Sequence, residues 1–147
     1  MLIGCCLAAP AFGRAEKHVA FVLWNGCDEA CRGFQDALKA SGSVTALTLY
    51  DLKKDLNEIP HVLAEIKRTR PDLLATWGTL PTLKLVGSDK DALSADYITS
   101  IPTVFMVVSQ PVESGLVSAL SSQGRNITGV TSLVPVSEQL QAARQFK

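Results

Sequence analysis

Continuous apolar segments alternate with segments of helical periodicity along most of this chain. The apolar segments, rich in β-branched and aromatic residues, span 18–24, 44–50, 72–77, 101–108 and 127–131. Helical spacing spans 28–41, 57–70, 79–87, 112–124 and 135–147. Strands that are apolar throughout are typical of a parallel sheet covered on both faces. The sequence therefore predicts an α/β fold, a three-layer parallel sheet of strand order 2-1-3-4-5 with helices on both faces.

The composition is that of one ordinary globular domain. The chain has 147 residues, of which 47% are hydrophobic, and its formal net charge is zero. That apolar fraction is enough to form a single core. Proteins that bind nucleic acid or an anionic membrane surface normally carry an excess of basic residues, so we expect neither as a partner.

The first fifteen residues differ from the rest. Residues 1–15 (MLIGCCLAAPAFGRA) are apolar or small and carry one charge, at Arg14. We interpret them as the remnant of an export signal cut near Ala11 or Ala15, although the basic start of such signals is missing. The alternatives are a buried first strand or helix, and a lipoprotein signal in which Cys5 of the sequence LIGC carries a lipid anchor. No apolar run approaches the roughly 20 residues needed to span a bilayer.

Two of the four cysteines lie outside that segment. Cys27 and Cys31 are four residues apart and, with Phe34 and Leu38, follow the spacing of a buried helix face. They can be two small core thiols, or a disulfide at the start of the helix if the protein is exported. Thioredoxin-type chemistry uses two intervening residues and not three, so metal binding or redox catalysis is the least favoured interpretation.

Ligands of an open parallel sheet bind beyond the carboxyl ends of its strands. The candidate ligand-binding residues in the turns that follow the strands are Trp24, Asn25, Gly78, Thr79, Ser109, Gln110 and Ser132. Gly78 would let the backbone approach a ligand closely, and Thr79 can cap the next helix, whose first amides favour a carboxylate or phosphate. Trp24 and Trp77 can each stack on an apolar ligand or fill the core.

The usual signatures of catalysis are missing from the sequence. GxGxxG, GxxxxGK[ST], HExxH and GxSxG motifs are all absent. His18 begins the first strand and His61 lies on a predicted helix, so neither is placed to act as a base at the strands' carboxyl ends. Asp89, Asp91 and Asp96 are typical of a solvated loop. We therefore expect no catalytic residue, no metal site and no cofactor.

Several segments occur in an order and spacing that resemble a known family. These are IPTVF (101–105), QPV (110–112), GLV (115–117), GRNITGV (124–130) and VPV (134–136). They resemble the ABC transporter substrate-binding proteins related to tryptophan/tyrosine-binding lipoproteins. DLLATWGT (72–79) resembles the third strand and loop of the same family, and the resemblance extends over residues 18–147.

The resemblance implies a type I periplasmic-binding fold, in which two lobes joined by a hinge close over a small solute without catalysis. It implies that 1–15 is an export signal remnant, 16–132 the N-terminal ligand-binding lobe, and 133–147 the hinge crossover and first helix of a truncated second lobe. The solute would be an amino acid or other small carboxylate, passed to an ABC transporter permease from the periplasm or another extracytoplasmic space. Gln110 stands where the family often has Asp, so a carboxylate that could pair with a ligand amino group is missing.

Two other functions are compatible with the sequence. The first is a sensor module of the same fold, in which closure over the ligand drives a signalling partner. The second is a doubly wound enzyme or a flavodoxin-like carrier, which visible flavin absorbance or turnover would reveal.

Overall fold

A computed structural model describes residues 16–42, 45–121 and 124–145, so the export signal predicted for 1–15 lies outside the described residues. Strands and helices alternate along the described chain. In order they are β1 (Lys17–Leu23), α1 (Glu29–Ala40), β2 (Thr45–Asp51), α2 (Ile59–Thr69), β3 (Leu73–Trp77), α3 (Thr79–Val86), β4 (Thr103–Val108), β5 (Ile127–Thr131) and α4 (Val136–Ala143). Short 3-10 turns cover Leu56–Glu58 and Asp89–Asp91.

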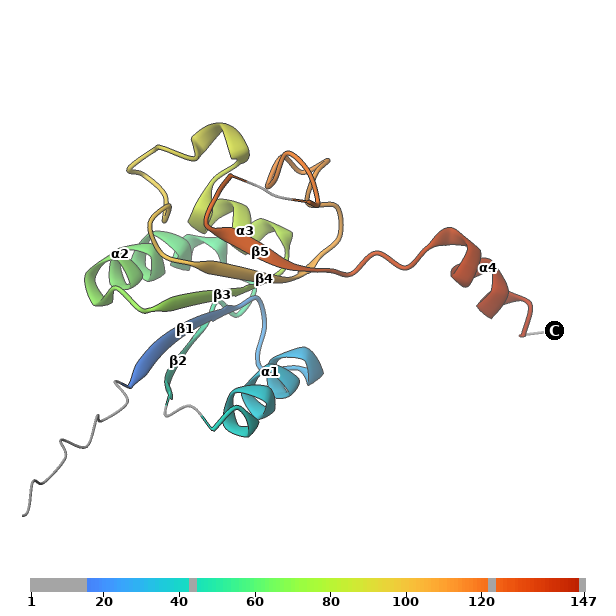
Figure 1. Cartoon of the computed structure of the whole chain (residues 1–147), viewed down its shortest axis with the longest axis horizontal. Helices are drawn as coiled ribbons and strands as arrows, with labels where there is room; N and C mark the ends of the chain where they lie inside the picture. Colours follow the sequence, from blue (N-terminus) through green and yellow to red (C-terminus); the bar gives the residue numbers. More distant parts are fainter. Residues whose placement is uncertain (1–15, 43–44, 122–123, 146–147) are drawn as a thin grey trace, which may run out of the picture.

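The strands form one parallel sheet in the order β2-β1-β3-β4-β5 (Figure 1). Every neighbouring pair in this order is parallel. The predicted fold class and strand order are therefore confirmed. Because all strands run the same way, their carboxyl ends meet at one edge of the sheet.

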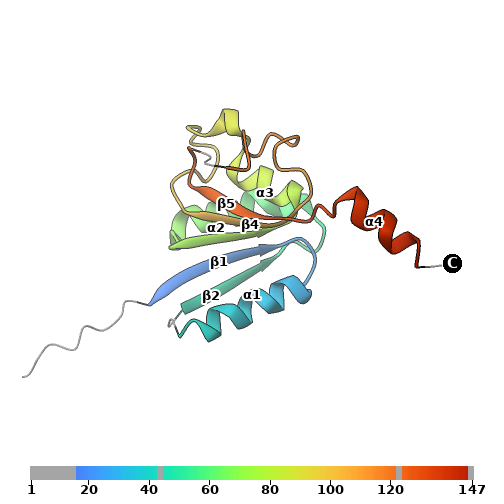
Figure 2. The same cartoon turned by 45° about the vertical axis from the view of Figure 1, so that its right-hand side comes forward.

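Helices cover both faces of the sheet, which gives three layers. Side chains of a strand point alternately to its two faces, and β1 uses both: Phe21 and Leu23 pack against α1, whereas Ala20 and Val22 join the larger core beneath α2 and α3. Figures 1 and 2 show α1 on one side of the sheet and α2 and α3 on the other. The burial of β1 on both faces explains its continuous apolar sequence.

The helix predicted over 112–124 is wrong. A single turn forms at 111–115, and the described residues after it are irregular. Gly115 takes a left-handed φ of +73° at the end of that turn. The Leu116 carbonyl, which a continuing helix would use internally, accepts a hydrogen bond from the Arg125 guanidinium at 2.8 Å. The left-handed Gly115 and the hydrogen bond from Arg125 thus replace the helix that the spacing of the apolar residues predicts.

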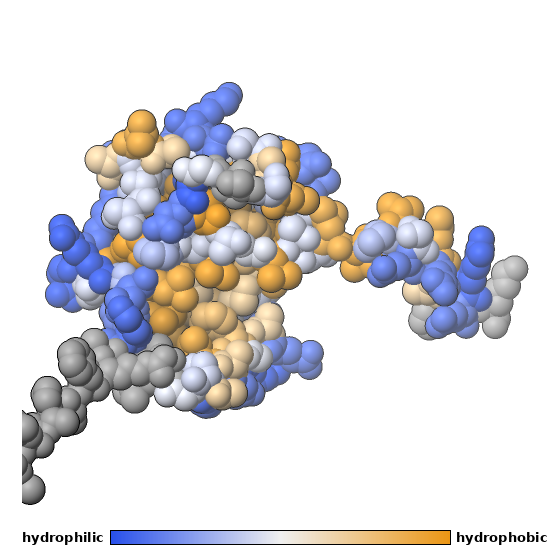
Figure 3. Space-filling model, viewed as in Figure 1, coloured by the Kyte–Doolittle hydropathy of each residue, from blue (hydrophilic) through white to orange (hydrophobic). Residues whose placement is uncertain are grey.

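The chain leaves β5 through an extended segment and enters α4, which lies apart from the sheet (Figures 1 and 2). No residue of α4 is buried. Large apolar side chains along this segment are at least half exposed, and Figure 3 shows the apolar surface that α4 presents. They are Leu133, Val134, Val136 and Leu140. The helix predicted from 135 is present, and Phe146, which we assigned to its apolar face, lies outside the described residues.

Candidate functional site

The carboxyl edge of the sheet, which we call the rim, carries all seven residues predicted to bind a ligand. They lie in the segments that directly follow β1, β3, β4 and β5. The Gly78 amide donates to the Met106 carbonyl at 2.9 Å, and the Ser132 amide donates to the Val108 carbonyl at 3.1 Å. These bonds hold the three segments side by side. Of the seven residues, Asn25, Ser109, Gln110 and Ser132 are exposed.

The start of α3 presents backbone amides at the rim. Gly78 precedes the helix with φ 92° and ψ 157°, a conformation that favours glycine. We predicted Thr79 as the cap, but Gly78 occupies the N-cap position and Thr79 is the first helical residue. Pro81 has no amide proton. The amides of Thr79 and Leu80 remain, and neither has a hydrogen-bond acceptor within the part of the chain that the structure describes. Such amides attract an anion.

Two buried threonines hold Gly78 in this position. The Thr82 hydroxyl donates to the Gly78 carbonyl at 2.6 Å and lies 2.8 Å from the Thr76 hydroxyl. Because the Thr82 proton is used on Gly78, the Thr76 hydroxyl is the donor to Thr82. Both side chains are fully buried. Sequence reasoning missed this pair, although a threonine within the apolar segment of β3 was the available signal.

The two tryptophans lie on opposite faces of the sheet. Trp24 is half-buried against the core under α2 and α3, whereas Trp77 is half-buried against the cluster beneath α1. The Trp77 indole N–H donates to the Asp28 carboxylate at 2.9 Å. Each ring therefore contributes to the core and reaches the rim, so the two interpretations of these residues are compatible.

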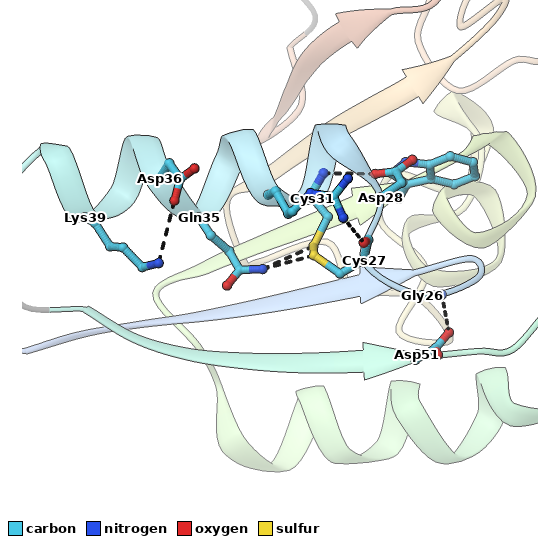
Figure 4. The surroundings of a disulfide bond; sticks show 10 residues. Gly26, Cys27, Asp28, Cys31, Gln35, Asp36, Lys39 and Asp51 are labelled. Carbon is cyan, nitrogen blue, oxygen red and sulfur yellow. Dashed lines mark hydrogen bonds and ion pairs between the residues drawn. A yellow bond between two sulfur atoms is a disulfide. The ribbon is translucent and has the colours of Figure 1, made fainter.

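A disulfide joins Cys27 and Cys31 at the rim, with Cα atoms 5.1 Å apart (Figure 4). Cys27 precedes the helix, which begins after the N-cap residue Asp28, so the predicted helical face does not include it. Cys31 is fully buried and Cys27 partly so. The Gln35 amide nitrogen lies 3.0 Å from the Cys27 sulfur and 3.3 Å from the Cys31 sulfur. The bond fixes the turn between β1 and α1.

Asp51 ties the same turn to the end of β2. Its carboxylate accepts hydrogen bonds from the amides of Gly26 at 2.9 Å and Lys53 at 3.0 Å (Figure 4 shows the first). The Gly26 amide, and after it the Lys53 amide, lower the pKa of Asp51 from its ordinary value. Lys53 and Lys54 follow with positive φ of 50° and 64°, which is unusual for lysine. Sequence reasoning missed this contact because it joins residues far apart in the chain.

The pairing of β4 and β5 is irregular near the rim. Their register shifts between Phe105 and Val108, and Val107 within the shift has a φ of 56°. A β-branched residue rarely takes this conformation, and a bulge bends its strand. Beyond the bulge, Val108 still pairs with Thr131. The irregularity therefore lies directly before the last residues of both strands, where they reach the rim.

A cavity of about 390 Å³ lies along β5, lined by Phe105, Val117, Arg125 and Gly129 among others. None of the seven predicted residues lines it. Neither histidine lies at the rim: His18 is in β1 at the amino edge, 2.9 Å from the Thr48 hydroxyl, and His61 is exposed on α2. The described residues contain no group of three or more potential metal ligands and no helix that could cross a membrane.

Comparison with known proteins gives one family. Residues 18–145 match the family model described as ABC transporter substrate binding protein. Comparison with curated protein sequences gives no match.

Three solved structures share the fold. A conserved domain protein from Vibrio cholerae has a TM-score of 0.72 at 23% identity, over 87% of this chain and 43% of its own. The ligand-free, open form of a substrate binding protein with adhesive properties from Clostridium difficile has a TM-score of 0.71 at 21% identity, over 88% and 43%. An ABC domain from Streptococcus pneumonia, in complex with L-Trp, has a TM-score of 0.65 at 17% identity, over 80% and 39%. The chain thus spans about two fifths of these relatives.

These structures share the fold of this chain, a parallel sheet of strand order β2-β1-β3-β4-β5 between helices. The chain belongs to the ABC transporter substrate-binding protein family, because the family model covers most of its length. This is a family of binding proteins and not of enzymes.

Proposed function

We propose that this chain is the front lobe of an extracytoplasmic solute-binding protein that serves an ABC importer. The observation that carries the proposal is the start of α3, where the Thr79 and Leu80 amides open onto the rim. A helix start of this kind binds a carboxylate through directed N–H groups and the helix dipole. We assign it to the carboxylate of a small solute, an amino acid or a related acid.

The aromatic residues of the rim favour a solute with an apolar part. Trp77 directly precedes Gly78, and Trp24 follows the neighbouring strand β1. Tryptophan supplies a broad apolar face together with a polar N–H. The relative from Streptococcus pneumonia is described in complex with L-Trp, which supports an aromatic amino acid as the first solute to test.

A second lobe would supply the other side of the site. The relatives are more than twice as long as the matched region, and α4 exposes an apolar face beyond the rim (Figure 3). We assign 16–132 to the first lobe and 133–147 to the crossover and first helix of the second. Closure of the two lobes would bury the solute and present a changed surface to the permease.

The proposed location follows from the same assignment. An importer collects its solute outside the cytoplasm, so 1–15 would act in export, with Cys5 as the residue that could carry a lipid anchor. An oxidising compartment also suits the Cys27–Cys31 disulfide.

Proline at position 79 tests the carboxylate site. Proline is well tolerated as the first residue of a helix but has no N–H, so Thr79→Pro in the full-length protein deletes one amide and keeps the helix start. Thr79→Ala deletes the hydroxyl and keeps the amide. By calorimetry with L-tryptophan, we expect Thr79→Pro to weaken binding about tenfold to hundredfold and Thr79→Ala to weaken it less. Equal affinity of all three proteins would refute the site.

A further inference from the structure

A covalent ring at the start of α1 contains two acidic residues, Asp28 and Glu29, of which Asp28 is the helix N-cap. The Cys27–Cys31 disulfide closes this ring around Asp28 (Figure 4). The Arg32 guanidinium donates to the Cys27 carbonyl at 3.3 Å, and Gln35 packs its amide on both sulfurs. Asp28 is therefore held in a turn that has little freedom to rearrange.

Both carboxylate oxygens of Asp28 are in use. Oδ1 accepts the Cys31 amide at 3.0 Å, as an N-cap residue does. Oδ2 accepts the Trp77 indole N–H at 2.9 Å, across 49 positions of sequence. The first bond holds the side chain of Asp28 in place, so the second restrains the direction in which the indole N–H points. N-capping alone would need only one of the two oxygens.

The residue whose indole Asp28 holds is close in sequence to the proposed carboxylate site. Trp77 ends β3, and α3 begins two residues later at Thr79. One side of the ring rests on the cluster formed by Phe21, Leu23 and Cys31. Being half-buried, the ring keeps exposed surface at the rim. Its orientation therefore affects the surface that the end of β3 presents.

We propose that Asp28, clamped by the Cys27–Cys31 disulfide, is a positioning residue that presets the Trp77 indole for solute binding. The part of this inference that concerns solute binding rests on the proposed function. The hydrogen bond between Asp28 and Trp77, which we call the clamp, can be measured without any solute. Holding a ring in its binding orientation removes the entropy cost of ordering it later, which is equivalent to about threefold to tenfold in affinity.

Asp28→Asn separates the two tasks of this carboxylate. Asparagine is as good an N-cap as aspartate, so the helix start remains. Its amide oxygen can replace Oδ1 and accept the Cys31 amide. Its NH2 group then takes the place of Oδ2 and is a donor, so the Trp77 N–H loses its acceptor. Asp36→Asn is the matched control, because Asp36 lies on the same helix, pairs with Lys39 at 3.6 Å (Figure 4) and is 75% exposed.

NMR tests the clamp through the rate of hydrogen exchange of the Trp77 indole N–H. The resonance of this N–H is assigned as the one missing from the spectrum of Trp77→Phe. We expect slow hydrogen exchange of this N–H in the oxidised full-length protein and in Asp36→Asn. We expect exchange at least about tenfold faster in Asp28→Asn, with reductant reproducing part of the change in the wild-type protein, since the ring then opens. Unchanged exchange in Asp28→Asn, with the helical circular dichroism retained, overturns the clamp.

Calorimetry with L-tryptophan tests whether the clamp affects the affinity for the solute. Asp28→Asn should bind about threefold to tenfold more weakly than the wild-type protein and Asp36→Asn. Wild-type affinity in Asp28→Asn, despite a released indole, overturns the positioning role and leaves the proposed function standing. If the wild-type protein binds no carboxylate solute while its indole is protected, the proposed function fails, and the role of Asp28 in binding fails with it.

Discussion

The hydroxyl pair beneath Gly78 gives a sharp test of how the helix start at the rim is held. Thr82→Val keeps the shape of the side chain and removes its hydroxyl. Two hydrogen bonds are lost, those at 2.6 Å to the Gly78 carbonyl and at 2.8 Å from Thr76. The buried Thr76 hydroxyl is then left without a partner. We expect Thr82→Val to lower the free energy of unfolding by about 2–3 kcal/mol.

Thr76→Val removes only the outer member of the pair. The Thr82 hydroxyl still donates to Gly78, so we expect a loss of about 1 kcal/mol. In the Thr82→Val background the same change removes an unpaired buried hydroxyl, and it should then cost nothing or stabilise the protein. The double variant should therefore be more stable than the sum of the single variants predicts, by about 1 kcal/mol or more.

Urea unfolding followed by circular dichroism measures these differences. Thr128→Val, on the exposed part of β5, is the control and should change the free energy of unfolding by less than about 0.5 kcal/mol. Strict additivity of the two single variants would refute the hydroxyl chain, as would a loss in Thr82→Val no larger than in the control.

Two further predictions concern the sheet edge and acid stability. Gly129→Ala should lower the free energy of unfolding by about 1–3 kcal/mol, because its Cβ would collide with the Phe105 carbonyl and ring. Gly33→Ala should instead stabilise α1 by about 1 kcal/mol, because its Cβ would meet nothing within 4 Å. Urea titrations that give the same sign for both variants would contradict this. The lowered pKa of Asp51 contributes stability above about pH 4 that is lost as the pH falls through its folded-state pKa. The difference in unfolding free energy between the wild-type protein and Asp51→Asn should therefore shrink on acidification, and a difference that grows instead would be evidence against the contact.

The fold was predictable because its signals are local. The continuous apolar sequence of β1 follows from burial on both faces, and Gly or Pro marks the ends of α2 and α3. The helix predicted at 112–124 is absent because Gly115 ends the first turn with a left-handed φ of +73° and the Arg125 side chain binds the Leu116 carbonyl. Periodicity carries no information about such a bond.

The position of the candidate residues at the rim was predictable, and the contacts among them were not. Parallel strands bring their following turns to one edge, which placed Thr79 and Ser132 at the rim from strand order alone. The bond from Trp77 to Asp28 and the bond from Gly26 to Asp51 join segments far apart in the chain. These pairs of residues meet only through the three-dimensional packing of the chain, and no residue spacing in the sequence indicates which residues will pair.

The central claim is that the amides at the start of α3 bind the carboxylate of a small solute. Amide chemical shifts of the full-length protein, titrated with L-tryptophan and with tryptamine, which lacks the carboxylate, test it most directly. We predict that L-tryptophan shifts the Thr79 and Leu80 amides strongly and that tryptamine does not. Equal effects of the two compounds, or shifts confined to the opposite edge of the sheet near His18, would contradict the account.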